Sequence, residues 1–310
     1  MIKKYILTIL ATAFCLISMA QDDLKLKLDS IATSGLEKGI PGIQVIISDS
    51  KGYTIYNYGH HEIEKTTEVN DSTRWRYGSI TKVFTAVMIL QLESEGKLSI
   101  DDSATKYIDL KQHNAAGITI KHLLNHSSGL YNYTASKKLK WEDTPNLCLE
   151  NSLKRKLNFT PGSKYDYCNT GYVILGLIIE KITAQSYQQN ITERIFKPCG
   201  LESMIYCSDD KIPFNTARGY KIKYNKYTDF TEIDHSWANS AGAVLGNLTD
   251  LNKFVDCLFK GNLIDSSQLK KMISPTIIYR DLNADGMEWF YHGVGLCWDL
   301  NLDKTEKPIY

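Results

Sequence analysis

One strongly apolar segment, residues 83–92, constrains the fold of this chain more than any other feature. Its apolar residues supply a wide helical face, and they are Val83, Phe84, Ala86, Val87, Ile89, Leu90 and Leu92. A helix with so broad an apolar face must be covered by other elements, because exposing that face to water is unfavourable. The chain has 310 residues, 43% of them apolar, which is enough for a large core in one or two domains.

The rest of the chain combines strands with further helices. Residues 22–37 are predicted to form an amphipathic helix, and residues 39–60 two strands around the turn Ser50–Gly52. Helical patterns follow within residues 79–96, 118–130, 170–185 and 247–261. Residues 289–302 alternate like a strand. Strands first, a long helical region and a return to strand predict an α+β fold rather than alternating βαβ units.

The first twenty residues have the features of a secretory signal peptide. Lys3 and Lys4 form a basic start, residues 5–17 form an apolar stretch, and Ser18–Ala20 ends in small residues. A membrane anchor is the alternative, but a span needs about 20 apolar residues and this run is shorter. We therefore expect cleavage after Ala20, a periplasmic or secreted protein, and no stable membrane span after that cleavage.

Charge and cysteine content limit the kinds of partner. The net charge is +1, with 36 basic and 35 acidic residues, so we expect no nucleic-acid partner. The cysteines after the signal are Cys148, Cys168, Cys199, Cys207, Cys257 and Cys297. They show no C-x-x-C metal spacing and are too sparse for a disulfide scaffold. We expect buried thiols, with a Cys199–Cys207 disulfide as the alternative in an oxidising compartment.

A serine and a lysine three residues apart, Ser79 and Lys82, stand at the start of the apolar helix. The spacing S-x-x-K occurs six times in the chain and decides nothing by itself. Only Ser79 has a glycine before it and a long apolar helix after it. In one interpretation Ser79 is an N-cap and Lys82 a solvated residue of the first turn. In the other interpretation they are a nucleophile and its base.

The start of a helix could supply what the second interpretation requires. Free N–H groups and the helix dipole stabilise negative charge on a serine oxygen and on an attacked carbonyl. Residues three apart share a helix face, so the Lys82 amine can reach the Ser79 hydroxyl. Apolar neighbours and the positive helix end disfavour an ammonium group, which predicts a lowered pKa for Lys82. Taken alone, the pair leaves both interpretations open.

A Tyr-x-Asn triplet supplies a second signal. Among nineteen tyrosines only Tyr167 begins such a triplet, in a loop just before a predicted helix. A phenol, with a pKa of about 10, can pass protons to a leaving group when a cationic lysine is near. Asn169 both donates and accepts hydrogen bonds, which suits holding a substrate amide or the lysine. The alternative is an ordinary tyrosine of a capping loop.

Five segments resemble the serine β-lactamase-like superfamily, in family order and spacing. The segments are GSITKVFTA, HLLNHSSGL, FTPGSKYDYCNTGYVILGLIIE, FKPCGLESM and SAGAVLGNLTDLNKF. The similarity extends from about residue 40 to the end, and it is greatest to the branch of class C β-lactamases, D-alanyl-D-alanine carboxypeptidases and related esterases. This resemblance implies an antiparallel sheet flanked by helices plus a large, mainly helical subdomain. It implies one domain over residues 21–310, with a sheet and helix part at 22–75 and a mainly helical part at about 76–285.

The resemblance also implies a reaction and a role for each candidate residue. Ser79 is the acylated nucleophile, Lys82 the general base, Tyr167 a second acid/base and Asn169 a substrate-orienting residue. No metal or organic cofactor is implied. The implied partner is a small-molecule or peptide substrate with an amide or ester bond. It would be a D-Ala-D-Ala-type peptide such as peptidoglycan supplies, a β-lactam or a small ester.

One motif of the family is absent. Members carry Lys-Thr-Gly or His-x-Gly on a strand beside the site, whereas here Lys304–Thr305 is followed by Glu306 and no His-x-Gly occurs. The segment YHGVGLCWDL resembles the one that precedes this motif, so we expect the sequence to stop just before it and to lack the C-terminal strands. The alternative function is a non-catalytic protein of the same fold that recognises cell-wall peptides or penicillins.

Overall fold

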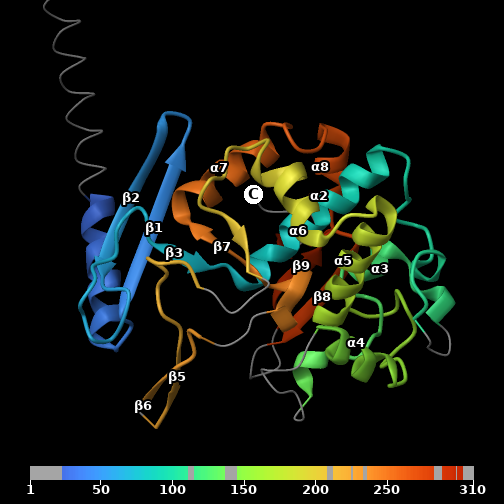
Figure 1. Ribbon diagram of the computed structural model, residues 1–310, viewed down its shortest axis with the longest axis horizontal. Coiled ribbons are helices and arrows are strands. Elements are labelled where there is room, and N and C mark those ends of the chain that lie inside the picture. The colour runs from blue at the N-terminus through green and yellow to red at the C-terminus, as the bar shows by residue number, and fades with distance from the viewer. Residues whose placement is uncertain are drawn as a thin grey trace, which may run out of the picture. The chain divides into compact units, whose positions relative to one another are not determined.

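The structure is a computed structural model, and it describes residues 23–110, 115–136, 145–207, 212–224, 226–232, 236–282, 288–297 and 299–302. The predicted signal peptide at residues 1–20 and the Lys304–Thr305 dipeptide lie outside the described residues. The chain divides into two compact units, one that ends at Thr73 and one that begins at Arg74 (Figure 1).

The unit that ends at Thr73 combines a helix with a two-stranded sheet. The helix covers residues 23–37. Strands β1 (Gly42–Asp49) and β2 (Gly52–Gly59) pair antiparallel, with Ile46 opposite Ile55. Both strands are rich in β-branched and aromatic residues, which suit a pleated sheet. The predicted hairpin is confirmed.

Helices dominate the unit that begins at Arg74. Its α-helices are α2 (Thr81–Ser94), α3 (Ile120–Leu124), α4 (Pro145–Leu153), α5 (Asn169–Thr183), α6 (Tyr187–Ile191), α7 (Leu248–Phe259) and α8 (Ser266–Ile273). Shorter helical segments are η1 (Gly78–Ile80), η2 (Ala104–Lys106), η3 (Ala115–Gly117), η4 (Tyr133–Ala135), η5 (Thr192–Phe196) and η6 (Ser236–Ala241). The predicted helices near Ser79, Thr170 and Asn247 are thereby confirmed.

The strands of this unit are short, and in the described residues they form three sheets. The strands are β3 (Arg74–Arg76), β4 (Ile205–Tyr206), β5 (Tyr220–Lys223), β6 (Lys226–Asp229), β7 (Val244–Asn247), β8 (Ile277–Leu282), β9 (Glu288–Val294) and β10 (Asp299–Leu302). One sheet has the order β3-β7-β4, a second is the hairpin β5-β6, and the third has the order β10-β9-β8. All pairings within these sheets are antiparallel, so the predicted α+β class is confirmed.

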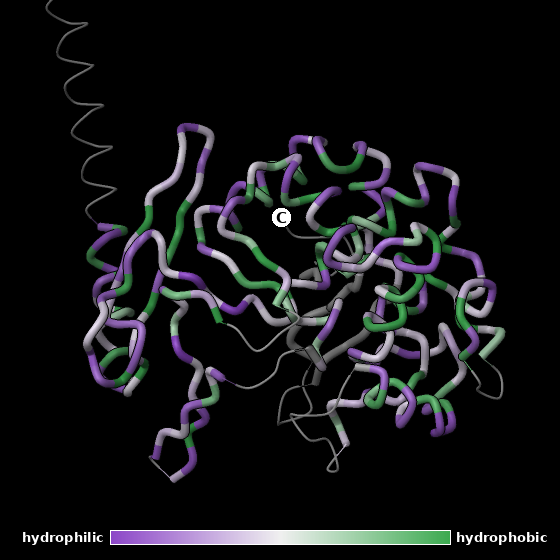
Figure 2. The backbone as a smooth tube through the Cα atoms, viewed as in Figure 1, coloured by the Kyte–Doolittle hydropathy of each residue, from purple (hydrophilic) through white to green (hydrophobic). Residues whose placement is uncertain are grey.

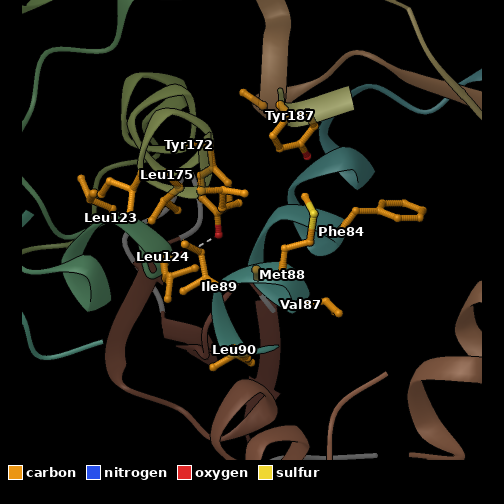
Figure 3. Close-up of a cluster of buried hydrophobic side chains, with 14 of the residues drawn as sticks. Phe84, Val87, Met88, Ile89, Leu90, Leu123, Leu124, Tyr172, Leu175 and Tyr187 are labelled. Carbon is orange, nitrogen blue, oxygen red and sulfur yellow. Dashed lines mark hydrogen bonds between the residues drawn. The ribbon is translucent and has the colours of Figure 1, made fainter. Parts of the chain in front are cut away.

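Helix α2 lies in the hydrophobic core together with α5. Ten of the 14 residues of α2 are buried, as expected for a helix that is apolar on several sides. The Phe84 ring stacks on Phe254 of α7, with 3.9 Å between the centroids. Between α5 and α3, the Tyr172 hydroxyl donates a 2.7 Å hydrogen bond to the Leu124 carbonyl (Figure 3). The apolar colour of α5 is visible in Figure 2, and the predicted burial of residues 83–92 is largely confirmed.

A disulfide joins Cys199 to Cys257, and it corrects two expectations. The predicted alternative, a Cys199–Cys207 pair, is wrong, and so is the expectation of thiols at Cys199 and Cys257. The fold gives the reason, because α7 packs beside the segment after η5 and brings the two Cα atoms within 6.0 Å. Cys207 is held elsewhere, since its N–H donates to the Ala243 carbonyl at 2.8 Å.

No helix in the described part of the chain combines the length and the apolar character that crossing a membrane requires.

Candidate active site

Ser79 lies in η1, in the short connection between strand β3 and helix α2. The preceding Gly78 has a φ of +52°, a left-handed conformation that a residue with a Cβ adopts only at a cost. This turn places Ser79 ahead of the helix, which begins at Thr81 with Ile80 in the cap position and no side-chain capping bond. The interpretation of Ser79 as an N-cap is therefore wrong.

Lys82 is the second residue of α2 and is only 2% exposed. Its Nζ donates one hydrogen bond to Ser79 Oγ at 3.1 Å and another to the Ala241 carbonyl at 2.7 Å. Burial lowers the pKa of Lys82 from 10.5 to about 8, because the ammonium has lost most of its hydration. The interpretation of Lys82 as a solvated residue is also wrong, and its amine is mainly neutral above about pH 8.

The Ala241 carbonyl reaches Lys82 because α2 holds the residues around it. Thr85 Oγ1 donates to the Ser240 carbonyl at 2.7 Å, and the Val244 N–H donates to Thr81 Oγ1 at 3.1 Å. On the other side, Ser240 Oγ donates to the carbonyl of Tyr172 in α5 at 2.8 Å. The loop that carries this carbonyl is thereby fixed by hydrogen bonds to both central helices.

Tyr167 approaches Ser79 from the loop before α5. Its hydroxyl donates to Ser79 Oγ at 2.7 Å, and its ring centroid lies 5.0 Å from Lys82 Nζ. The side of Tyr167 away from the core is open, since the residue is 37% exposed. Partial burial raises the pKa of the Tyr167 phenol, so the phenol is protonated at neutral pH. The structure thus brings Ser79, Lys82 and Tyr167 together around one oxygen atom.

Asn169 is the first residue of α5 and lies beside this group rather than in it. Its side-chain amide donates to Thr134 Oγ1 at 3.1 Å and to Asn132 Oδ1 at 3.4 Å. Its backbone N–H also donates to Asn132 Oδ1, at 3.3 Å. The hydrogen bonds described for Lys82 go to Ser79 and Ala241, so the predicted option that Asn169 holds the lysine is not what this structure has.

Sequence reasoning missed two partners of the three central residues. A backbone carbonyl such as that of Ala241 has no signature in a sequence, because every residue carries one. The other partner is His126, which the motifs did not single out and whose buried ring lies 4.4 Å from the Tyr167 ring. Its place in the segment HLLNHSSGL was the one available signal.

Two cavities lie elsewhere in the described part of the chain. One cavity of about 520 Å³ lies between η5 and β4, where Phe196, Lys197 and Met204 are among its lining residues. A second, of about 380 Å³, lies beside the ion pair of Arg194 and Glu95. Neither cavity includes Ser79 among its lining residues. Within the described ranges, no group of three or more His, Cys, Asp or Glu residues is arranged to hold a metal ion.

Curated relatives match most of this chain but only part of their own length. Protein flp of Staphylococcus aureus (strain MW2) is 28% identical over 286 residues, which are 87% of this chain and 56% of that protein. The putative penicillin-binding protein PbpX of Bacillus subtilis (strain 168) is 29% identical over 240 residues, 77% of this chain and 60% of that protein. The chain therefore spans a little more than half the length of these relatives.

A solved structure and a family model both match most of this chain. The crystal structure of a D-stereospecific amidohydrolase from Streptomyces sp. superposes with a TM-score of 0.74 at 26% identity, covering 86% of this chain and 80% of the other. The fold is of the β-lactamase and transpeptidase type. The sequence model of the Beta-lactamase family matches residues 27–306, which is most of the chain. The chain belongs to the Beta-lactamase family.

Proposed function

We propose that this protein is a serine hydrolase that cleaves an amide or an ester through an acyl-enzyme at Ser79. The observation that carries the proposal is the convergence of Lys82 Nζ and the Tyr167 hydroxyl on Ser79 Oγ, at 3.1 and 2.7 Å. A nucleophile within hydrogen-bond reach of a base, with the base oriented by a third group, is the arrangement that nucleophilic catalysis needs. Here the third group is the Ala241 carbonyl.

Acylation would use the neutral form of Lys82. Ser79 Oγ attacks the carbonyl carbon of the substrate, and the Ser79 proton passes to Lys82 Nζ. The tetrahedral intermediate then breaks the bond to the leaving group, which takes a proton from the Tyr167 hydroxyl. The Lys82 ammonium returns a proton to the phenolate, so the site is ready for the second half of the reaction. Asn169 would orient the substrate from its position at the start of α5.

Deacylation would reverse these roles with water as the nucleophile. Neutral Lys82 takes a proton from the water as it attacks the acyl carbon, with the Tyr167 hydroxyl able to relay it by passing on its own proton, and the Lys82 ammonium returns a proton to Ser79 Oγ as the serine leaves. The balanced result is one water consumed, with an acid and an amine or alcohol released. The proton transfers in these steps use only Ser79, Lys82, Tyr167 and the attacking water.

What the relatives are described as doing, together with the chemistry of the site, supports a proposal for the substrate class. One structural neighbour is a D-stereospecific amidohydrolase and one sequence relative a putative penicillin-binding protein. We propose a D-amino-acid peptide such as peptidoglycan supplies, a β-lactam or a small ester as substrate. The Cys199–Cys257 disulfide supports the proposed export, because such bonds persist mainly in oxidising compartments.

Covalent labelling tests the proposal directly. A fluorophosphonate and a fluorescent penicillin should each label the folded protein at Ser79, identified by peptide mass spectrometry. Ser79→Ala should abolish the label. A matched control is Ser267→Ala, because Ser267 also begins an S-x-x-K sequence but is an exposed residue of helix α8. This control should label as the wild type does.

The alternative function, a non-catalytic protein that recognises cell-wall peptides, predicts a different result. Such a protein would bind a D-Ala-D-Ala peptide reversibly and would carry no covalent label at Ser79. A label at another serine or at a cysteine would overturn the assignment of the nucleophile.

A further inference from the structure

The geometry points to His126 as the residue that positions Tyr167 against Ser79. This inference rests on the proposed function, in which Tyr167 is the acid that protonates the leaving group. His126 follows α3 and is 5% exposed. It does not contact Ser79 in the described hydrogen bonds, so any effect it has on the reaction passes through the tyrosine.

Two hydrogen bonds that His126 accepts hold the chain on both sides of Tyr167. The backbone carbonyl of His126 accepts from the Asp166 N–H at 2.9 Å. Its ring Nδ1 accepts from the Cys168 N–H at 3.1 Å. The residues before and after the tyrosine are therefore tied to one residue, which fixes the loop where the phenol leaves the backbone.

The ring of His126 also contacts the phenol itself. The ring centroids of His126 and Tyr167 are 4.4 Å apart with the planes tilted by 33°, and Tyr172 lies on the same imidazole at 5.2 Å. Contacts of this kind fix the plane of an aromatic side chain. The Tyr167 hydroxyl lies 2.7 Å from Ser79 Oγ, and a displacement of about 1 Å would break that bond.

His126 is suited to a positioning role and not to proton transfer. Because Nδ1 accepts from a backbone N–H, the imidazole is neutral and its proton is on Nε2. Burial and the nearby Lys82 lower the pKa of His126 to about 3, so the ring stays neutral where Lys82 would act. Its φ of +59° is rare for a residue with a side chain, and such conformations gather at functional sites.

A double-mutant cycle with His126→Ala and Tyr167→Phe tests the inference on two esters of one acid. A 4-nitrophenolate leaves without a proton, whereas the alkoxide of an ethyl ester needs one. His126→Ala should lower kcat/KM, which reports on acylation, for the ethyl ester at least about tenfold and for the 4-nitrophenyl ester less than about threefold. In the Tyr167→Phe background it should lower kcat/KM for the ethyl ester less than about twofold, because the group it positions is gone.

Two further variants separate positioning from folding. His126→Asn keeps a side-chain acceptor and tolerates the left-handed backbone, so it should recover part of the activity toward the ethyl ester. If His126→Ala does not fold, His126→Asn takes its place in the double-mutant cycle. The control is His122→Ala. Like His126, His122 accepts a backbone N–H at its ring Nδ1, but the donor is Thr119, at 3.2 Å, and not a residue next to Tyr167. Its loss should affect both esters equally.

Each outcome of the cycle decides the inference. An equal loss on both esters, or additive losses from His126→Ala and Tyr167→Phe, would overturn the positioning role and leave the proposed function intact. If Tyr167→Phe left ethyl ester hydrolysis unchanged, the proposed role of Tyr167 and the inference about His126 would both fail.

Discussion

Replacing Lys82 by methionine should change how the stability of the protein depends on pH. Methionine has a similar length and apolar character but cannot be protonated. In the folded protein the Lys82 pKa is lowered to about 8 from its ordinary 10.5, because burial penalises the ammonium. The unfolded chain therefore binds this proton more tightly than the folded chain does, and the proton favours unfolding.

The size and the pH range of this effect follow from the two pKa values. Below pH 8 Lys82 is protonated in both states, and its burial lowers the free energy of unfolding by about 3 kcal/mol. That cost declines by up to about 1.4 kcal/mol per pH unit from pH 8 upward and is gone above pH 10.5. The methionine variant avoids this cost but leaves the Ala241 carbonyl without its donor, a loss of about 1–3 kcal/mol that does not vary with pH.

Urea unfolding at pH 7, 8, 9 and 10 measures the difference between the two proteins. We expect the wild type to gain stability relative to Lys82→Met steadily between pH 8 and pH 10. A control is Lys260→Met, whose side chain is 67% exposed and pairs with Asp256 on the surface, and which should show no such gain. A difference between wild type and Lys82→Met that is constant across this range would refute a buried lysine with a lowered pKa.

Three further predictions concern the reaction and the disulfide. The value of kcat/KM should rise about tenfold per pH unit up to about pH 8 and then level off, as Lys82 loses its proton, and a flat profile from pH 6 to 8 would contradict this. Tyr167→Phe should slow acylation by an amide at least about a hundredfold in single-turnover assays with the fold intact by circular dichroism, and near-normal rates would exclude Tyr167 as the acid. Replacing Cys199 and Cys257 by alanine should lower the free energy of unfolding by about 4 kcal/mol, because the bond closes a 58-residue loop. Equal stability of the two proteins without reductant would contradict a disulfide in the protein.

The parts of the fold that the sequence predicted well depend on nearby residues. Strands β1 and β2 meet across a short turn, and their alternation is visible without knowledge of the rest of the chain. The start of α7 is equally local, since the Asn247 side chain accepts from the Asp250 N–H at 2.9 Å. Strand β7, just before that helix, was not among the predicted strands. Its four residues are too few to show alternation, and its neighbours β3 and β4 come from distant parts of the chain.

In the candidate site, too, the features that depend on nearby residues could be predicted from the sequence, and those that depend on distant segments could not. The spacing of Ser79 and Lys82 follows from helix geometry, but burial of the lysine depends on the loop that brings the Ala241 carbonyl to it. That approach needs Gly176 in α5, because a Cβ there would lie 2.2 Å from Ser240 Oγ. A motif can therefore name the nucleophile and its base, whereas the lowered pKa of the base is a property of the assembled core. For this reason the pH dependence of unfolding tests the site more stringently than the motif does, and it requires no knowledge of the substrate.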